Sequence, residues 1–166
     1  MIITQTLGNI NTIDTSNKVI DWLPLQWFET SKRILRKKTL SGKEVALKFL
    51  NESTTLTQGD IVWQDEQTII AIDVLPCDCL VIQPKNMFEM ASVCYEIGNK
   101  HLPLFYETDE LLVPFELPLQ RLLMAQGYEV RNEKRKLLQS LKTTVAPHGN
   151  NNESLFSRIM KLSSNE

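Results

Sequence analysis

The sequence predicts an α+β protein: a small all-β domain at the N-terminus, then a ferredoxin-like βαββαβ domain and a flexible C-terminal tail. Three observations lead to this prediction. Before about residue 75, apolar and polar side chains alternate in short runs, as they do in strands. Helical and strand patterns then follow one another in the order of the ferredoxin-like motif. The end of the chain is rich in Asn and Ser and has neither period. We expect these parts to span residues 1–75, 76–146 and 147–166.

The N-terminal part is expected to be a small β-sandwich or barrel. Lys32–Leu50 has the pattern of a hairpin whose turn is Ser41-Gly42, because apolar and polar residues alternate after that turn. Thr68–Val74 is rich in β-branched residues, which favour strands.

The C-terminal part is expected to contain two helices. Asn86 is a suitable N-cap for the first helix, with Glu89 at the spacing of a capping box. Gly98 and Asn99 tolerate the left-handed conformation and should end this helix. Phe115–Gln126 has the period of the second helix. We expect the strands at Leu80–Ile82, Leu102–Tyr106 and Leu111–Val113, with the last strand drawn from Tyr128–Val130 and Leu137–Val145.

Composition excludes several classes of protein. Lys and Arg total 18 against 20 for Asp and Glu, so the net charge is −2, which argues against general nucleic-acid binding. The basic run Lys32–Lys38 lacks interleaved aromatic residues and favours a solvated strand face or an acidic protein partner. No secretory signal or membrane-length apolar run is present, so we expect a cytoplasmic protein with reduced thiols and no membrane association.

The chain lacks the sequence signature of an enzyme. It has no nucleophile elbow, phosphate-binding loop, dinucleotide-binding glycines or His-Glu-x-x-His motif. Cys94, on an expected helix face, favours simple burial over a role as a nucleophile. We therefore expect no enzymatic activity.

Cys77 and Cys79 are a weak candidate for a metal site. In an extended chain, residues i and i+2 point the same way, so both thiols could face one soft metal. A Cys-x-Cys pair without further ligands is more often two small apolar residues at the start of a buried strand. Both interpretations stay open.

His101 lies in the stretch "YEIGNKHLPL", where a helix gives way to a strand. One interpretation is a cation beside the last carbonyls of the helix, with a modest electrostatic role. The other is an exposed imidazole that binds a divalent metal. A two-fold axis near His101 would bring two imidazoles onto one ion, and imidazole suits nickel, copper and zinc.

Three stretches, in order, resemble the UreE family of urease accessory proteins: "DWLPLQWFETSKRILRKKTLSGKEVAL", "LTQGDIV" and the segment Ala91–Leu104. The last of these looks like the family's most characteristic motif, a tyrosine, Gly-Asn, one variable residue and His-Leu-Pro. "PFELPLQRLLMAQGYEV" is similar to the family's second helix. The resemblance covers about residues 1 to 145.

The resemblance implies a homodimeric nickel metallochaperone that delivers Ni²⁺ to apo-urease with the accessory proteins, including the accessory GTPase. It implies an N-terminal domain that binds peptides or protein partners and a metal-binding C-terminal domain. His101 matches the motif histidine, which would hold Ni²⁺, or Zn²⁺ or Cu²⁺, at the dimer interface. Family tails are often rich in histidine, whereas this tail has only His148, a second candidate ligand.

A carrier must release its ion, which favours a shared, exposed site with few ligands over a closed cage. Protonation of imidazole competes with the metal, so we expect nickel binding to weaken in acid. The alternative is a peptide-binding assembly chaperone with incidental metal affinity.

Overall fold

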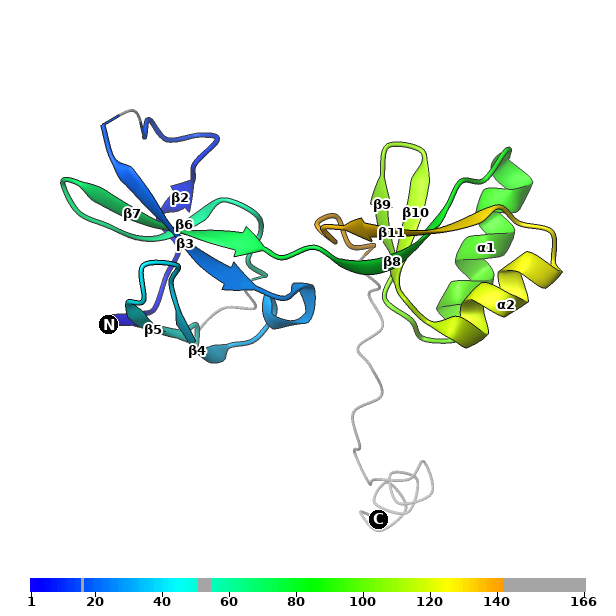
Figure 1. The fold of residues 1–166 in the computed structure, drawn as a ribbon, viewed down its shortest axis with the longest axis horizontal. Helices are drawn as coiled ribbons and strands as arrows, with labels where there is room; N and C mark the ends of the chain where they lie inside the picture. The colour runs from blue at the N-terminus through cyan, green and yellow to red at the C-terminus, as the bar shows by residue number, and fades with distance from the viewer. Residues whose placement is uncertain (16, 51–54, 142–166) are drawn as a thin grey trace, which may run out of the picture.

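The computed structural model describes residues 1–15, 17–50 and 55–141. It confirms the predicted fold class: an all-β N-terminal domain is followed by a domain of one sheet and two helices (Figure 1). The predicted tail, 147–166, lies outside the described residues. In the described part of the chain, no helix is long and apolar enough to cross a membrane.

The N-terminal domain consists of two sheets. One has the strand order β2-β6-β7-β3, and the other has the order β1-β5-β4. The predicted hairpin is β4 and β5, and its turn contains Gly42 at a φ of 88°. The strands are β1 (Ile2–Ile3), β2 (Gly8–Asn9), β3 (Val19–Leu25), β4 (Ile34–Lys38), β5 (Glu44–Lys48), β6 (Asp60–Gln64) and β7 (Thr68–Val74). A short 3-10 helix, η1 (Trp27–Glu29), follows β3.

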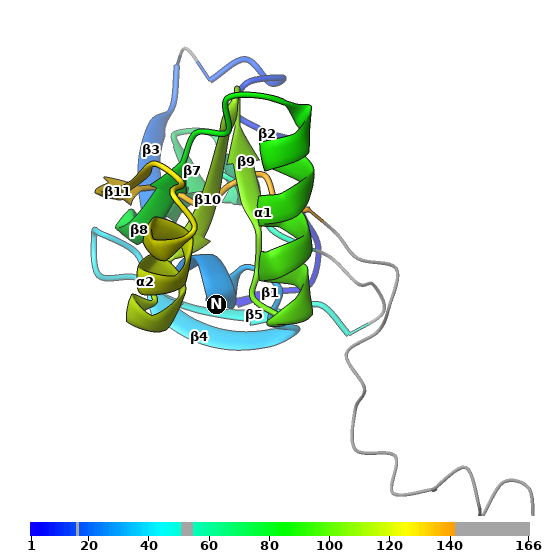
Figure 2. The same ribbon diagram turned by 90° about the vertical axis from the view of Figure 1, so that its right-hand side faces the viewer.

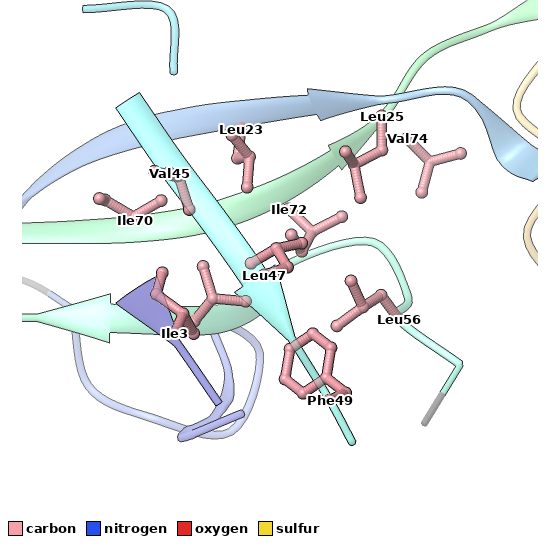
Figure 3. Close-up of a cluster of buried hydrophobic side chains, with 11 residues drawn as sticks. Ile3, Leu23, Leu25, Val45, Leu47, Phe49, Leu56, Ile70, Ile72 and Val74 are labelled. Carbon is pink, nitrogen blue, oxygen red and sulfur yellow. The ribbon is translucent and has the colours of Figure 1, made fainter. Parts of the chain in front are cut away.

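The two sheets enclose one apolar core (Figure 3). Alternate residues of each strand point inward, so Leu23 and Leu25 of β3 face Val45 and Leu47 of β5. All four side chains are at most 2% exposed. Truncation of one such leucine to alanine destabilises a protein by about 2–5 kcal/mol.

The C-terminal domain has a four-stranded antiparallel sheet in the order β11-β8-β10-β9. This is the arrangement expected for a ferredoxin-like βαββαβ unit. Both helices cover the same face of the sheet, on the side away from the N-terminal domain (Figures 1 and 2). The elements are β8 (Cys77–Ile82), α1 (Met87–Asn99), β9 (Phe105–Glu107), β10 (Glu110–Pro114), α2 (Leu117–Ala125) and β11 (Val130–Arg135).

The last strand differs from the prediction. It is Val130–Arg135, whereas the described part of Leu137–Val145 contributes only an isolated bridge from Ser140 to Phe105. The sequence VRNEKR has no apolar alternation, but the charges of its two arginines are neutralised by carboxylates. Two arginines of β11 pair with carboxylates of β9, β10 and β11 itself; these residues are Arg131, Arg135, Glu107, Glu110 and Glu133.

The second face of this sheet meets the N-terminal domain. The rings of Trp27 and Phe105 contact each other edge to face, with centroids 5.6 Å apart. Lys136 forms an ion pair with Asp73, with 2.6 Å between nitrogen and oxygen. The two helices therefore form the outer side of the C-terminal domain, away from the N-terminal domain (Figures 1 and 2).

Candidate metal centre

His101 follows immediately after α1 and its C-cap residue, Lys100. Its backbone is left-handed, with a φ of 54°. The His101 N–H donates to the Gly98 carbonyl at 2.9 Å, and the Leu102 N–H donates to the Ile97 carbonyl at 3.4 Å. These two bonds form a Schellman motif, in which His101 occupies the position that glycine usually takes.

The predicted helix end is therefore corrected in one respect. Gly98 and Asn99 are both helical, and His101 is the left-handed residue. The chain must reverse after Lys100 so that Leu102 can pack against the apolar cluster that contains Ile97. Histidine is among the residues that tolerate the left-handed region, together with asparagine and aspartate.

The His101 side chain is exposed at the end of the helix. Beside it, Lys100 forms a loose ion pair with Glu96, at 3.8 Å. Within the described ranges, no group of three or more His, Cys, Asp or Glu side chains is placed to hold a metal ion. One chain thus offers a single imidazole here, which is an incomplete site for a divalent metal.

An exposed apolar stripe runs along α1 toward His101. Phe88 is 79% exposed and Tyr95 is 72% exposed, with Ala91 between them and Gly98 one turn beyond. Met87, at the start of the helix, is 85% exposed. Contiguous apolar side chains this exposed are typical of an interaction surface.

Sequence reasoning assigned the residues of this stripe to one helix without recognising that they form a second face. The signal was present, because Met90, Val93 and Ile97 already supply the face that packs on the sheet. A helix that has apolar residues outside the stripe facing its own core presents a further apolar face, which a partner can bury.

The cysteine pair lies on the opposite face of the sheet from α1, at the start of β8. The Cys77 and Cys79 sulfurs are 3.6 Å apart, as the shared direction of residues i and i+2 predicts. Burial raises the pKa of Cys77 and raises that of Cys79 to about 12, so both thiols hold their protons near neutral pH. Cys94 packs against the helix-side cluster, and burial raises its pKa too. In the described part of the chain, none of these thiols belongs with His101 to a group of three or more potential metal ligands.

The other predicted ligand, His148, lies outside the described residues. Its placement relative to His101 therefore remains a prediction from the sequence.

A second surface feature of the molecule lies on the N-terminal domain. It is a hollow of about 470 Å³ on the outer face of the β1-β5-β4 sheet. Register places Ile2, Ala46 and Arg36 in one row across the three strands. In the described part of the chain, Arg36 and Lys48 have no ion-pair partner. The hollow is lined by Met1, Ile2, Arg36, Lys37, Lys38, Glu44, Val45, Ala46 and Lys48.

This hollow extends the predicted basic run. Lys48 lies on the second strand of the predicted hairpin, outside the basic run, and Ile2 lies on β1, whose pairing with β5 the sequence did not predict. Lys37 belongs to the predicted run but pairs with Glu29, at 2.8 Å.

Comparison with known proteins agrees with the order of the two domains along the chain. Residues 3–75 match the N-terminal domain of the UreE urease accessory protein, and residues 77–150 match its C-terminal domain. The urease accessory protein UreE of Flavobacterium johnsoniae is 46% identical over 163 residues, covering 98% of this chain and 99% of that protein. The UreE proteins of Haemophilus influenzae (strain PittEE) and Helicobacter pylori (strain G27) are 40% and 38% identical. They cover 87% and 92% of this chain, and 80% and 92% of their own lengths. With both domains matched in order along nearly the whole chain, this protein belongs to the UreE family of urease accessory proteins.

Proposed function

We propose that this protein is a cytoplasmic, homodimeric nickel chaperone that delivers Ni²⁺ to apo-urease during assembly of its metal centre. It acts with the other urease accessory proteins, including the accessory GTPase. The observation that carries the proposal is the placement of His101: an exposed imidazole, without further ligands from the described residues of its own chain, at the end of an exposed apolar helix stripe.

The dimer supplies the missing ligand. Burial of the α1 stripe against a second copy about a two-fold axis near His101 would place two imidazoles on one ion. His148 of the tail is a candidate for a further ligand. Nickel is the proposed cargo, and Zn²⁺ and Cu²⁺ are expected to bind the same nitrogens.

A shared site of this kind suits delivery. Its ligands are few and exposed, and separation or rearrangement of the two chains would open it, so an ion held there can pass to an acceptor. A closed four-ligand site within one chain would hold its ion much longer.

Nickel titration tests the assignment of His101. We expect wild-type protein to bind one nickel ion per two chains, with the dimer monitored by light scattering. His101→Asn should lose that ion, whereas Arg121→Ala, an exposed change on α2, should keep it. Unchanged stoichiometry and affinity in His101→Asn would remove His101 from the site.

The hollow on the N-terminal domain is the proposed docking surface for protein partners. Its cations Arg36 and Lys48, which have no ion-pair partner among the described residues, lie beside the exposed apolar side chains of Met1 and Ile2. This combination suits a partner segment with both acidic and apolar residues. The double variant Arg36→Glu and Lys48→Glu should weaken association with the accessory GTPase or apo-urease. Lys134→Glu, an equal change of charge per residue on the C-terminal domain, should leave it intact. Equal binding by both variants would exclude this surface.

The same hollow favours a second candidate function, a peptide-binding assembly chaperone whose metal affinity is incidental. The two functions differ in what His101 does. Full urease activation by His101→Asn in a reconstituted system would favour the second candidate, whereas loss of activation that free nickel restores would favour the nickel chaperone.

A further inference from the structure

At the end of α1, Gly98 and His101 each occupy a backbone conformation that would suit the other residue better. Gly98 is inside the last helical turn, and glycine is the least favourable residue in a helix after proline. His101, three residues later, has the left-handed backbone that glycine favours most. A sequence that contradicts local preference without a local reason is typical of a functional position.

Nothing in the described chain requires glycine at position 98. Its φ is not positive, and a Cβ built there would meet no atom within 4 Å apart from the backbone of its own helix and its chain neighbours. The residue is exposed and lies on the same stripe as Ala91 and Tyr95. An alanine would therefore fit this chain and strengthen the helix.

The proposed metal site, on which this inference rests, supplies a geometric reason. If zinc–imidazole bonds of about 2 Å are a guide, one ion brings two imidazole nitrogens within about 4 Å of each other. Gly98 precedes His101 by less than one helical turn, and a turn rises about 5.4 Å. Two imidazoles on one ion therefore bring the last turns of the two α1 helices toward each other. Helices pack with their axes about 8–10 Å apart, depending on the side chains at the contact, and glycine permits the shortest separation.

We propose that Gly98 is a positioning residue: the backbone of a second copy's α1 occupies the space that a Cβ would fill, which lets two His101 side chains reach one ion. The partner is a second copy because a two-fold contact pairs a surface patch with itself. The apolar stripe of α1 leads to His101, which in the proposed site lies next to His101 of the second copy. Tyr95, one turn before Gly98, packs across the same contact.

The variant Gly98→Ala separates this role from a structural one, with Arg121→Ala on the exposed face of α2 as the control. At concentrations where wild type is monomeric, Gly98→Ala should raise the Tm by a few degrees, because alanine favours the helix. At higher concentration its dimer dissociation constant should rise by about tenfold or more. Half-saturation with nickel should move to higher nickel in parallel. Arg121→Ala should change neither the dimer nor nickel binding.

Three results would overturn the proposal. Dimerisation and nickel binding like those of wild type would show that the partner does not approach Gly98. A lower Tm in the monomer would show that glycine serves this chain's own fold. Nickel binding by the His101→Asn variant, or by wild type as a monomer, would remove the proposed function as well. Both results are recognised before any Gly98 variant is made.

Discussion

At the scale of single residues, His101 both ends a helix and presents the candidate ligand. Its left-handed backbone closes the Schellman motif and places Leu102 in the core, while its side chain remains exposed. A substitution at this position therefore changes two properties, and the choice of replacement decides which of them an experiment reports.

His101→Asn and His101→Val should separate these properties. Asparagine tolerates the left-handed region, so His101→Asn should keep the free energy of unfolding within about 0.5 kcal/mol of wild type. Valine is β-branched and does not tolerate that region, so His101→Val should lower it by about 1–2 kcal/mol. Both variants should lose nickel binding. Urea unfolding of the metal-free proteins checks this, and equal stability of the two variants would contradict the assigned backbone.

The buried thiol of Cys79 gives a second prediction at this scale. Its side chain is 0% exposed and its pKa is raised to about 12, so at pH 8 it is protonated and shielded from reagents. Iodoacetamide should leave Cys79 unmodified in native protein and alkylate all three cysteines in urea, as peptide mass analysis would show. Rapid alkylation of Cys79 in the native state would instead indicate a thiolate ready to bind a soft metal.

At the scale of elements, a buried carboxylate connects β3 to the turn of the β4–β5 hairpin. Asp21 accepts hydrogen bonds from the Ser41 N–H at 3.1 Å and the Ser41 hydroxyl at 2.5 Å. Burial alone would raise the pKa of Asp21, but these bonds, a Thr39 hydroxyl and the charge of Lys43 outweigh it and lower the pKa. The folded pKa thus lies below the unfolded value of about 3.9. The resulting stability is present above the unfolded value and is lost as pH falls through the folded one.

Ser41→Ala should lower the free energy of unfolding by about 1.5–3 kcal/mol at pH 7, the range for hydrogen bonds to a charged group. The penalty should shrink below about pH 4, as Asp21 becomes protonated in wild type. Urea titrations at several pH values check this, with Ser31→Ala, an exposed change, as the control. A penalty that is constant or grows in acid would contradict the role of the Asp21 charge.

Elements were predictable where the apolar period and the turn chemistry agree. The β4–β5 hairpin has alternating apolar residues and Gly42 at its turn, and Asn86 caps α1 by accepting from the Glu89 N–H at 3.0 Å. The strand β11 was not predictable, because it lacks an apolar period and its arginines pair with carboxylates of β9 and β10, which are distant in sequence. A local pattern cannot show charges that are neutralised across a sheet.

At the scale of the whole molecule, the architecture separates two surfaces. The helix-covered face of the C-terminal domain carries His101 and the α1 stripe, while the N-terminal domain packs against the other side of that sheet (Figures 1 and 2). Docking of partners on the β1-β5-β4 sheet would therefore leave the proposed dimer face uncovered. One molecule could hold its ion and engage a partner at the same time.

The candidate site was predictable from sequence only as far as one chain can specify it. The motif around Gly98 and His101 identified the imidazole through its resemblance to a family. The physical pattern alone favoured a histidine at a helix end with a modest electrostatic role. The proposed second imidazole is outside what the sequence period and the fold of one chain can specify, because a site shared across a two-fold axis would exist only in the assembly.

The native mass of the purified full-length protein after nickel loading tests the central claim most directly. We predict that the wild-type protein has the mass of two chains with one nickel ion. The His101→Asn variant should carry no nickel. Nickel on single chains, or an unchanged ion count in His101→Asn, would contradict a site shared between two copies of His101.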